Sequence, residues 1–387
     1  IALRDNRDVL LKSEDVKKAK EKIAEAKGGL LPTLNFTGGW TDTRGYYAKD
    51  VSQTTAQATL KQYLYKGGKV INTIKKTQYD LEVTQALLDK TKLETILNVK
   101  KAFYTLLLAE EFANLNKEIL DNTQAYLEMT GARYQKGEAS ESDVLKIKES
   151  KSSVEEAYEA SLNEIESSLA LLKNLSCLDE KVNIKPNGQF VYEPKEIAYD
   201  ESFLMALQTR PEIKQHEAQE QANKKAIEIA KADNRPSVYA SWDYYSRSHN
   251  SATATRGWND YNVIGLTFSW PVFDGWATRA KVEQAIVDLK ETQLTKEKSI
   301  KDIALELKSA YLDLKNALAK IKSAEAQLVL YKDTFSVAED KYKSGIVSSL
   351  DLNDASLGYM ISLFNQNEAI YDYVLAKAKF DKATGGL

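Results

Sequence analysis

The sequence predicts an internally duplicated α+β membrane protein, in which long α-helical hairpins form an α-barrel and two β-hairpins give four strands to a shared transmembrane β-barrel. Three observations predict this fold. The same order of elements is written twice, two long segments hold neither glycine nor proline, and alternating segments that carry or adjoin all five tryptophans precede them. Together they indicate two similar halves that act as one structure.

Landmarks of the first half recur in the second half at a nearly constant offset. Four residues of the first half recur 208 positions later, namely Tyr134, Gly137, Ser140 and Asp143 as Tyr342, Gly345, Ser348 and Asp351. Closer to the start of the chain the offset is 204, as for Pro32 and Pro236. The β-hairpin of the second half therefore holds four more residues than that of the first. A unit of this length is a duplicated domain, because solenoid repeats run to roughly 20 to 50 residues.

The predicted first repeat covers residues 1–200 and the second covers residues 201–387. In the first repeat we expect a helix at 2–29, a β-hairpin at 31–65, a helical hairpin at 67–175 and a linker at 176–200. In the second repeat we expect a helix at 202–232, a β-hairpin at 236–273 and a helical hairpin at 275–383. The chain begins inside an amphipathic pattern, so any signal peptide or lipid anchor would lie upstream of Ile1.

The helical hairpins are predicted from two segments that are rich in strong helix formers. Neither Lys69–Thr130 nor Ala277–Ser344 contains glycine or proline, and helices of this length would run to roughly 90 to 100 Å. Their apolar residues recur every three or four positions in a narrow stripe, as at Ile303, Leu307 and Leu314. Such helices must pack side by side in a thin-walled array, with one face wet.

Each long helix ends at a predicted turn. Gly137 and Gly345 each follow Tyr-x-x and precede Ser-x-x-Asp, which predicts a glycine helix stop followed by a capping-box helix start. The descending helices would then return from Ser140 and from Ser348.

The β-hairpins are predicted from strict alternation of apolar with small or polar residues. The pattern is clearest at Leu34, Phe36, Gly38 and Trp40 in the first half, and at Ile264, Leu266, Phe268 and Trp270 in the second. Apolar-out and polar-in alternation over about ten residues is typical of a transmembrane barrel strand. We expect an aromatic girdle at the two membrane interfaces, formed by Trp40, Trp242, Trp258 and Trp270. Strands also favour aromatic residues in soluble sheets, which is the alternative interpretation.

Composition excludes several other classes of function. The net charge is only −3, so a nucleic-acid partner, which needs a clustered basic excess, is not expected. A single cysteine, Cys177, and two histidines far apart leave almost no material for a Cys/His metal site, and no cofactor is predicted. We find no catalytic triad, metal cluster or phosphate loop, so we do not expect an enzyme.

Membrane strands also predict an oligomer. In hydrocarbon every backbone N–H and C=O must be paired, and four strands cannot close a barrel when the smallest known have about eight. The barrel must therefore be shared between copies of the chain. Two copies would give eight strands and three would give twelve, and only the wider ring leaves room for a passage.

The duplicated motifs resemble those of the TolC-type outer-membrane efflux proteins. The resemblance covers essentially the whole chain and rests on the duplicated order of elements and on three kinds of motif. These are the helix-to-strand junctions at 26–34 and 230–238, the Trp270–Gly275 exit, and the turns at 133–137 and 341–345. It implies a homotrimer in the cell outer membrane, in contact with its lipid and extending into the periplasm. It also implies a periplasmic adaptor protein and an inner-membrane pump as partners.

The resemblance also implies roles for residues near the turns. Two acidic rings of the pore constriction correspond to Asp351 and Asp354, six and nine residues after Gly345. Asp351 can serve as a cap, as pore lining or as both, whereas Asp354 lies beyond the reach of capping and is better explained by pore lining. Tyr342 and Asp143 stand at two gate positions, but Val347 stands where the family has an arginine.

The turn residues Gly137, Gly345 and Ile346 match the surface on which family members meet the adaptor. For Lys136 and Glu138, a glycine helix cap with solvated neighbours is an equally good explanation. The main alternative for the whole chain is a periplasmic coiled-coil adaptor or scaffold protein without a pore. The alternating hairpins favour the membrane channel, because an adaptor has no use for apolar strand faces flanked by aromatic residues.

Overall fold

The computed structural model describes residues 1–45, 51–188, 190, 192, 197–250 and 257–386. By its internal contacts the chain divides into two compact units, and each takes segments from both halves of the sequence. The sheet unit consists of Ser13–Leu87 and Lys214–Lys298. The hairpin unit consists of Ile1–Lys12, Leu88–Ile213 and Ser299–Leu387. The contacts therefore group like parts of the two repeats together.

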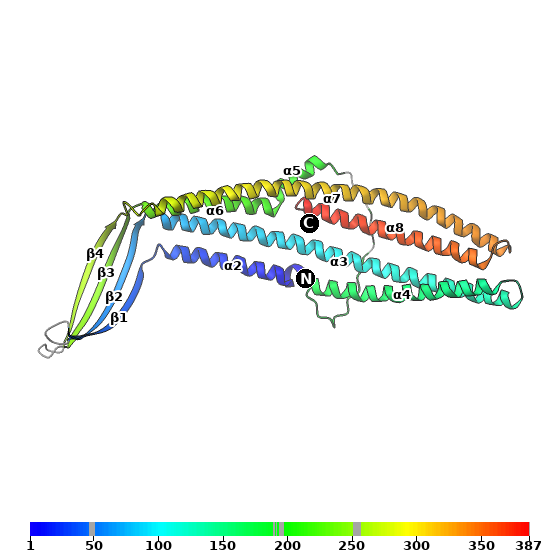
Figure 1. Cartoon of the computed structure of the whole chain (residues 1–387), viewed down its shortest axis with the longest axis horizontal. Coiled ribbons are helices and arrows are strands. Elements are labelled where there is room, and N and C mark those ends of the chain that lie inside the picture. The colour runs from blue at the N-terminus through cyan, green and yellow to red at the C-terminus, as the bar shows by residue number, and fades with distance from the viewer. Residues whose placement is uncertain (46–50, 189, 191, 193–196, 251–256, 387) are drawn as a thin grey trace. The chain divides into compact units, whose positions relative to one another are not determined.

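The sheet unit contains a four-stranded antiparallel sheet in the order β1-β2-β3-β4 (Figure 1). Its strands are β1 (Thr33–Thr43), β2 (Val51–Lys66), β3 (Ser237–Asn250) and β4 (Trp258–Ser269). The two predicted hairpins lie side by side, because β2 of the first pairs with β3 of the second. Among the described residues, β1 and β4 each pair on one side only.

The alternating pattern fixes the register of the sheet. Leu34 is opposite Leu60, Leu60 is opposite Trp242, and Trp242 is opposite Ile264. Because side chains alternate between the faces of a strand, this row places apolar residues of all four strands on one face. That face is open in the single chain, where Leu34 is 69% exposed and Ile264 is 83% exposed.

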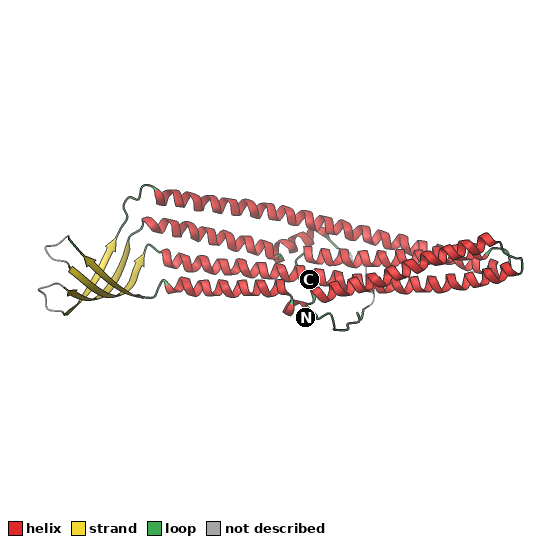
Figure 2. Ribbon diagram, turned by 60° about the horizontal axis from the view of Figure 1, so that its bottom comes forward, coloured by secondary structure: helices red, strands yellow, loops and turns green. Residues whose placement is uncertain are grey.

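Four helices lead to and from the strands, each with part of its length in the sheet unit (Figure 2). They are α2 (Arg7–Gly28), α3 (Lys69–Gln135), α6 (Pro211–Lys231) and α7 (Ala277–Lys343), and α6 is followed by a 3₁₀ turn, Ala232–Asn234. Asp233 in that turn accepts from Lys69 Nζ at 2.6 Å and Lys281 Nζ at 3.1 Å. This carboxylate therefore ties together the helices that follow β2 and β4.

The hairpin unit consists of antiparallel helix pairs, as the glycine-free segments predict. The second part of α3 packs with α4 (Glu141–Leu175), and the second part of α7 packs with α8 (Ser349–Ala383) (Figure 1). The predicted stripe of α7 is buried: Ile303, Leu307 and Leu314 are each at most 4% exposed. Leu314 and Ile321 pack in one apolar cluster with Tyr373 of α8. No helix within the described segments is long and apolar enough to cross a membrane.

The linker between the repeats is packed rather than loose where the structure describes it. Ile184 joins the apolar cluster of α3 and α4, and a Cβ on Gly188 would stand 2.9 Å from the ring of Phe103. Further along, Tyr192 meets Tyr373 of α8 edge to face, with ring centroids 5.1 Å apart. The linker thus contacts both helical hairpins.

The single helices predicted at 2–29 and 202–232 were wrong in one respect, because each is broken. The first divides at Asn6 into α1 (Ala2–Asp5) and α2, and the second at Arg210 into α5 (Tyr199–Thr209) and α6. Asn6 and Arg210 stand 204 positions apart and share an extended backbone, with φ −63° and ψ 130° in both. For Arg210 the cause is Pro211, since the residue before proline avoids helical geometry.

At each break, the side chain donates a hydrogen bond to the last carbonyl oxygen of a returning helix. Asn6 Nδ2 donates to the carbonyl oxygen of Leu175, the last residue of α4, at 3.1 Å. Arg210 Nη1 donates to the carbonyl oxygen of Ala383, the last residue of α8, at 3.5 Å. Both contacts satisfy carbonyls that have no partner within their helix.

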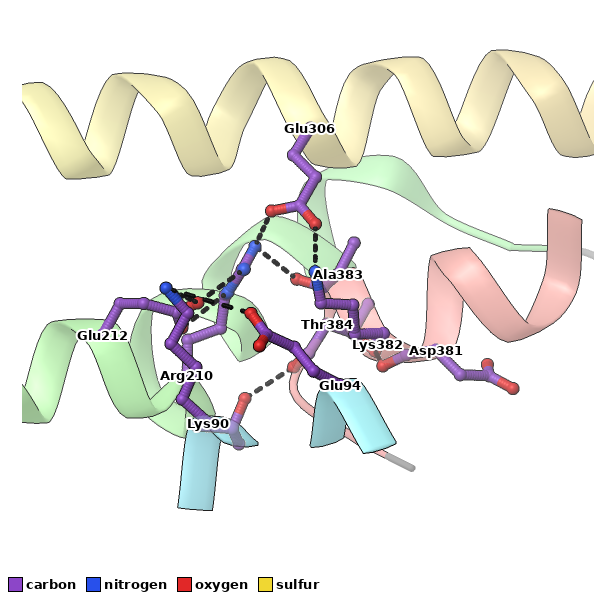
Figure 3. Close-up of polar contacts among 10 residues, drawn as sticks. Lys90, Glu94, Arg210, Glu212, Glu306, Asp381, Lys382, Ala383 and Thr384 are labelled. Atoms are coloured by element: carbon purple, nitrogen blue, oxygen red, sulfur yellow. Dashed lines mark hydrogen bonds and ion pairs between the residues drawn. The ribbon is translucent and has the colours of Figure 1, made fainter. Parts of the chain in front are cut away.

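Arg210 also forms a buried ionic cluster (Figure 3). Its guanidinium pairs with Glu306 Oε2 at 2.6 Å and donates to both carboxylate oxygens of Glu212, at 3.1 and 3.2 Å. Lys382 Nζ lies 3.1 Å from the other oxygen of Glu306. Because the Arg210 side chain is only 4% exposed, the carboxylates offset the cost of burying its charge.

Replacing Arg210 by methionine should destabilise the hairpin unit by about 3 kcal/mol. This is the low end for breaking a buried ion pair, because Glu306 is 38% exposed and water can reach it once the guanidinium is gone. The thermal midpoint in detergent measures the loss. Arg4→Met is the matched control, since its pair with Asp5 is exposed, and it should leave the midpoint unchanged. Equal midpoints for the two variants would contradict the assigned role of Arg210.

The same cluster predicts a pH dependence. Burial is the largest single influence and acts to raise the pKa of Glu212 and of Glu306. The hydrogen bonds and positive charges of Arg210 and the nearby lysines together outweigh it, so both pKa values lie below the ordinary range. A lowered pKa gives stability that is present above the unfolded pKa and lost as the pH falls through the folded one. The difference in midpoint between wild type and Arg210→Met should therefore be full above about pH 5 and shrink as the pH falls below about 4. A constant difference would contradict this.

Candidate functional site: the hairpin ends and the two faces of the sheet

The turns of both helical hairpins are built alike, as their motifs predict. Gly137 and Gly345 have φ values of 77° and 73°. In each turn, the N–H groups of the glycine and of the residue after it donate to carbonyl oxygens of the last helical turn. In the second turn Ile346 N donates to Lys341 O at 2.9 Å and Gly345 N donates to Tyr342 O at 3.0 Å. This glycine-ended pattern leaves the Ile346 side chain 72% exposed.

Both returning helices begin with the predicted capping box. Asp143 N donates to Ser140 Oγ at 3.2 Å, and Asp351 N donates to Ser348 Oγ at 3.1 Å. The Ser348 hydroxyl and its backbone N–H in turn donate to Asp351, which holds the pKa of that carboxyl below its usual value. Asp351 is therefore a cap and carries a negative charge.

Asp354 lies one turn further along α8 on the same exposed face as Asp351. Between them, Asn353 is buried and donates through Nδ2 to Ser150 Oγ of α4 at 3.5 Å. The acidic pair is thus presented on the side of α8 that does not pack against α4. The first hairpin has Asp143 and Lys146 at the corresponding positions, so only the second presents two acids.

The two predicted gate residues have different partners. The Tyr342 hydroxyl accepts from Ser349 Oγ at 3.4 Å and lies 3.9 Å from Met129 Sδ of α3. The Arg133 guanidinium lies over the Tyr342 ring, 4.4 Å from its centre, while Asp143 takes part in its own capping box. The contact of Tyr342 with Arg133 was not predicted, although Arg133 stands in the turn motif beside Tyr134.

Four of the five tryptophans lie at three levels along the sheet. Trp40 is opposite Thr54, Thr54 is opposite Ser248, and Ser248 is opposite Trp258, so the two tryptophans share one row near the loop ends. Trp270 directly follows the last residue of β4 at the other end. Trp242 lies in the row of Leu34 and Ile264, midway between these levels.

The opposite face of the sheet is polar. Thr59 Oγ1 donates to Asp243 Oδ1 at 2.6 Å, and Gln57 Nε2 donates to the same oxygen at 3.3 Å. Two rings of this face, Tyr245 and Tyr261, stack with centroids 4.9 Å apart. The cross-strand partners explain why Asp243 is tolerated in the middle of a strand.

Among the described side chains, no group of three or more His, Cys, Asp and Glu residues is arranged to hold a metal ion. What the described residues offer instead is two surfaces: an acidic helix face at the second turn, and a sheet with one apolar and one polar face.

A model of the family described as outer membrane efflux protein matches residues 1–176 and 204–386. The chain belongs to the outer membrane efflux protein family. The match covers both halves of the sequence, and the unmatched residues 177–203 contain most of the linker. As a member of this family, the chain is a protein of the cell outer membrane that extends into the periplasm.

Known outer membrane proteins resemble the chain in sequence and in fold. The outer membrane protein TolC of Salmonella enteritidis is 26% identical over 138 residues, which is 33% of this chain and 28% of that protein. The Campylobacter jejuni CmeC outer membrane channel shares 19% identity and a TM-score of 0.83, covering 100% of this chain and 84% of that one. The open state of the Neisseria gonorrhoeae MtrE outer membrane channel shares 16% identity and a TM-score of 0.84, covering 100% of this chain and 87% of that one. At these identities the solved structures show the fold alone, and they confirm the predicted fold class.

The capping role of Asp351 can be separated from any role in a pore. Asp351→Ala removes the carboxylate that accepts from the Ser348 N–H and hydroxyl, so hydrogen exchange at the first amides of α8 should become about fivefold faster, as expected for roughly 1 kcal/mol of local stability. Asp354→Ala removes the same charge one turn further in and should leave that exchange unchanged. Hydrogen-exchange mass spectrometry on the hairpin peptides measures both. Equal acceleration in the two variants would refute the assignment.

Proposed function

We propose that this efflux-family chain is one protomer of a trimeric outer-membrane channel, the exit duct of a tripartite efflux or secretion system. It conducts substrates passively from the periplasm to the exterior through a gated tube. The observation that carries the proposal is a four-stranded sheet with one exposed apolar face, one polar face and two edge strands paired on one side only. Such a sheet is incomplete as a single chain.

The trimer follows from the need to pair β1 and β4 in the membrane. An unpaired backbone group in hydrocarbon costs several kcal/mol, so the free side of β4 must meet the free side of β1 in a neighbouring copy. Two copies of the four-stranded sheet give eight strands, whose interior is filled by side chains, whereas three copies give twelve and an open passage. The polar face would then line that passage.

The levels of tryptophan match the thickness of a bilayer. Trp258 and Trp270 are twelve positions apart on the apolar face, which is about 40 Å along a strand and about 30 Å across a membrane once the strand tilts by about 40°. We assign Trp40 and Trp258 to one interfacial girdle and Trp270 to the other. Trp242 lies within the apolar band between them.

At the periplasmic end, we assign the constriction of the tube to the exposed face of α8. Threefold repetition would gather Asp351 and Asp354 into two acidic rings that attract cations. Tyr342 and Asp143 are proposed as gate contacts, with Val347 in place of the family's arginine. The adaptor, which would link the channel to an inner-membrane pump, is proposed to dock on the turns at Gly137, Gly345 and Ile346, where Ile346 offers an exposed apolar side chain.

Transport of this kind needs no chemical step, so we assign neither a catalytic residue nor a cofactor to the chain. The alternative function is a periplasmic coiled-coil adaptor without a pore. The exposed apolar face of the sheet favours the channel, because an adaptor would leave Leu34, Phe36 and Ile264 in water without a role.

Planar-bilayer recording of the detergent-purified protein tests the proposal. Wild type should run as a trimer, insert, and conduct with a preference for K⁺ over Cl⁻. Asp351→Asn combined with Asp354→Asn should lower that permeability ratio by about tenfold, since rings of fixed charge concentrate counter-ions to this extent.

Glu14→Gln is the matched control, because it removes one negative charge from an exposed position of α2 in the sheet unit. It should leave the permeability ratio unchanged. A monomeric protein that fails to insert would overturn the channel function. A conducting trimer whose selectivity ignores both aspartates would overturn only the assigned constriction.

A further inference from the structure

Two lysines and two tyrosines form a compact cluster at the helix end of the polar sheet face. Lys61 Nζ lies 3.8 Å from the ring centre of Tyr239 and 4.8 Å from that of Tyr63. Lys66 Nζ lies 4.5 Å from the ring centre of Tyr63. The two rings are 5.5 Å apart and tilted by 60°. Two positive charges therefore lie within one patch of aromatic surface.

A bulge in β2 creates this cluster. The register shifts between Tyr63 and Tyr65, so that Tyr63 is opposite Tyr239, Tyr65 is opposite Val238, and Lys66 is opposite Ser237. Leu64 is the extra residue. Without it, strict alternation would place Lys66 on the face opposite Lys61 and Tyr63, whereas with it all three share the polar face.

The charge of this cluster is not neutralised within the described part of the chain. Neither Lys61 nor Lys66 has an ion pair with a carboxylate there, and their recorded contacts are with the rings. Asp243, the acid of the neighbouring polar row, accepts instead from Thr59 and Gln57. A cation over a tyrosine face keeps its positive charge and its capacity to attract an anion.

An open cavity of about 390 Å³ adjoins the cluster through Lys66. Two further lysines, Lys22 and Lys69, line it, together with Glu25 and the apolar side of Val70. Lys69 is held by Asp233 at 2.6 Å. The cavity thus combines excess positive charge with room for an organic group rather than for a bare ion.

We propose that Lys61, Tyr63, Lys66 and Tyr239, with the adjoining cavity, form a binding site for organic anions that carry an aromatic body. The anionic group meets the two ammonium groups, and the aromatic body stacks on the tyrosine rings or enters the cavity. This inference rests on the proposed function, because the polar face lines a substrate path only if the chain forms the channel. It deepens that function by naming a substrate class which the acidic hairpin end would not attract.

Binding to the detergent-solubilised protein tests the site without requiring conduction. The probe is naphthalene-1-sulfonate, with the trimethyl(1-naphthyl)ammonium cation as its partner of opposite charge, both measured by titration calorimetry. Wild type should bind the anion and not the cation. Lys61→Gln and Lys66→Gln should each weaken anion binding by about fivefold, which is the effect of losing one charge at a few ångströms near a protein surface.

Lys27→Gln is the control, since it removes a lysine from an exposed position of α2 outside the cluster and the cavity lining. It should bind the anion as wild type does. Lys61→Arg, which keeps the charge over the ring, should retain binding. Equal affinity for the two probes, or unchanged anion affinity in the Lys61→Gln/Lys66→Gln double variant, would overturn the site.

Bilayer recording separates this inference from the proposed channel. If wild type conducts, naphthalene-1-sulfonate should block the current, and the double variant should need at least about tenfold more of it. A conducting channel that is blocked equally in wild type and double variant would overturn the site but leave the channel. A protein that binds the anion in detergent yet never conducts would overturn the channel but leave the site.

Discussion

Backbone hydrogen bonding at the edges of the sheet is the constraint on which the rest of the structure depends. Within the described chain, β1 and β4 each leave one row of N–H and C=O groups without a strand partner. In water such edges invite aggregation, and in hydrocarbon they cannot exist. In the proposed channel, the sheet resolves both problems by closing with other copies of itself. The exposed apolar residues and the polar opposite face are the features on which that proposal depends.

The two repeats solve one structural task with different chemistry. In each, a break in the first helix presents a side chain to the last carbonyl of the returning helix. Asn6 does so with an amide that also caps α2, through Asp8 N at 2.9 Å. Arg210 does so with a guanidinium that needs Glu212 and Glu306 to offset its burial. The two halves share the backbone geometry of the break, while the second half holds its helix end with an ionic cluster whose stability depends on pH.

Sequence patterns predicted those features that are periodic or local. Helix length, strand alternation, turn glycines and the capping boxes of Ser140 and Ser348 all depend on residues within a few positions of each other, and the structure confirms them. The break at Arg210 had a signal in Pro211 that outweighs the helical pattern around it. The break at Asn6 had no comparable breaker, and the contact of Arg133 with Tyr342 joins residues 209 positions apart. Such contacts depend on tertiary packing, which periodicity does not encode.

The bulge at Leu64 affects both the faces of β2 and the point at which the chain leaves the sheet. Because one added residue transfers every later side chain of the strand to the other face, the length of β2 sets both which groups line the polar surface and the direction in which the chain leaves toward α3. Gly67 follows at φ 60°, where a Cβ would stand 2.8 Å from Ala232 O, so the exit itself cannot shift. Insertions and deletions should therefore not be tolerated between Tyr63 and Gly67. The length of this short segment therefore determines which side chains of β2 lie on the polar face of the sheet.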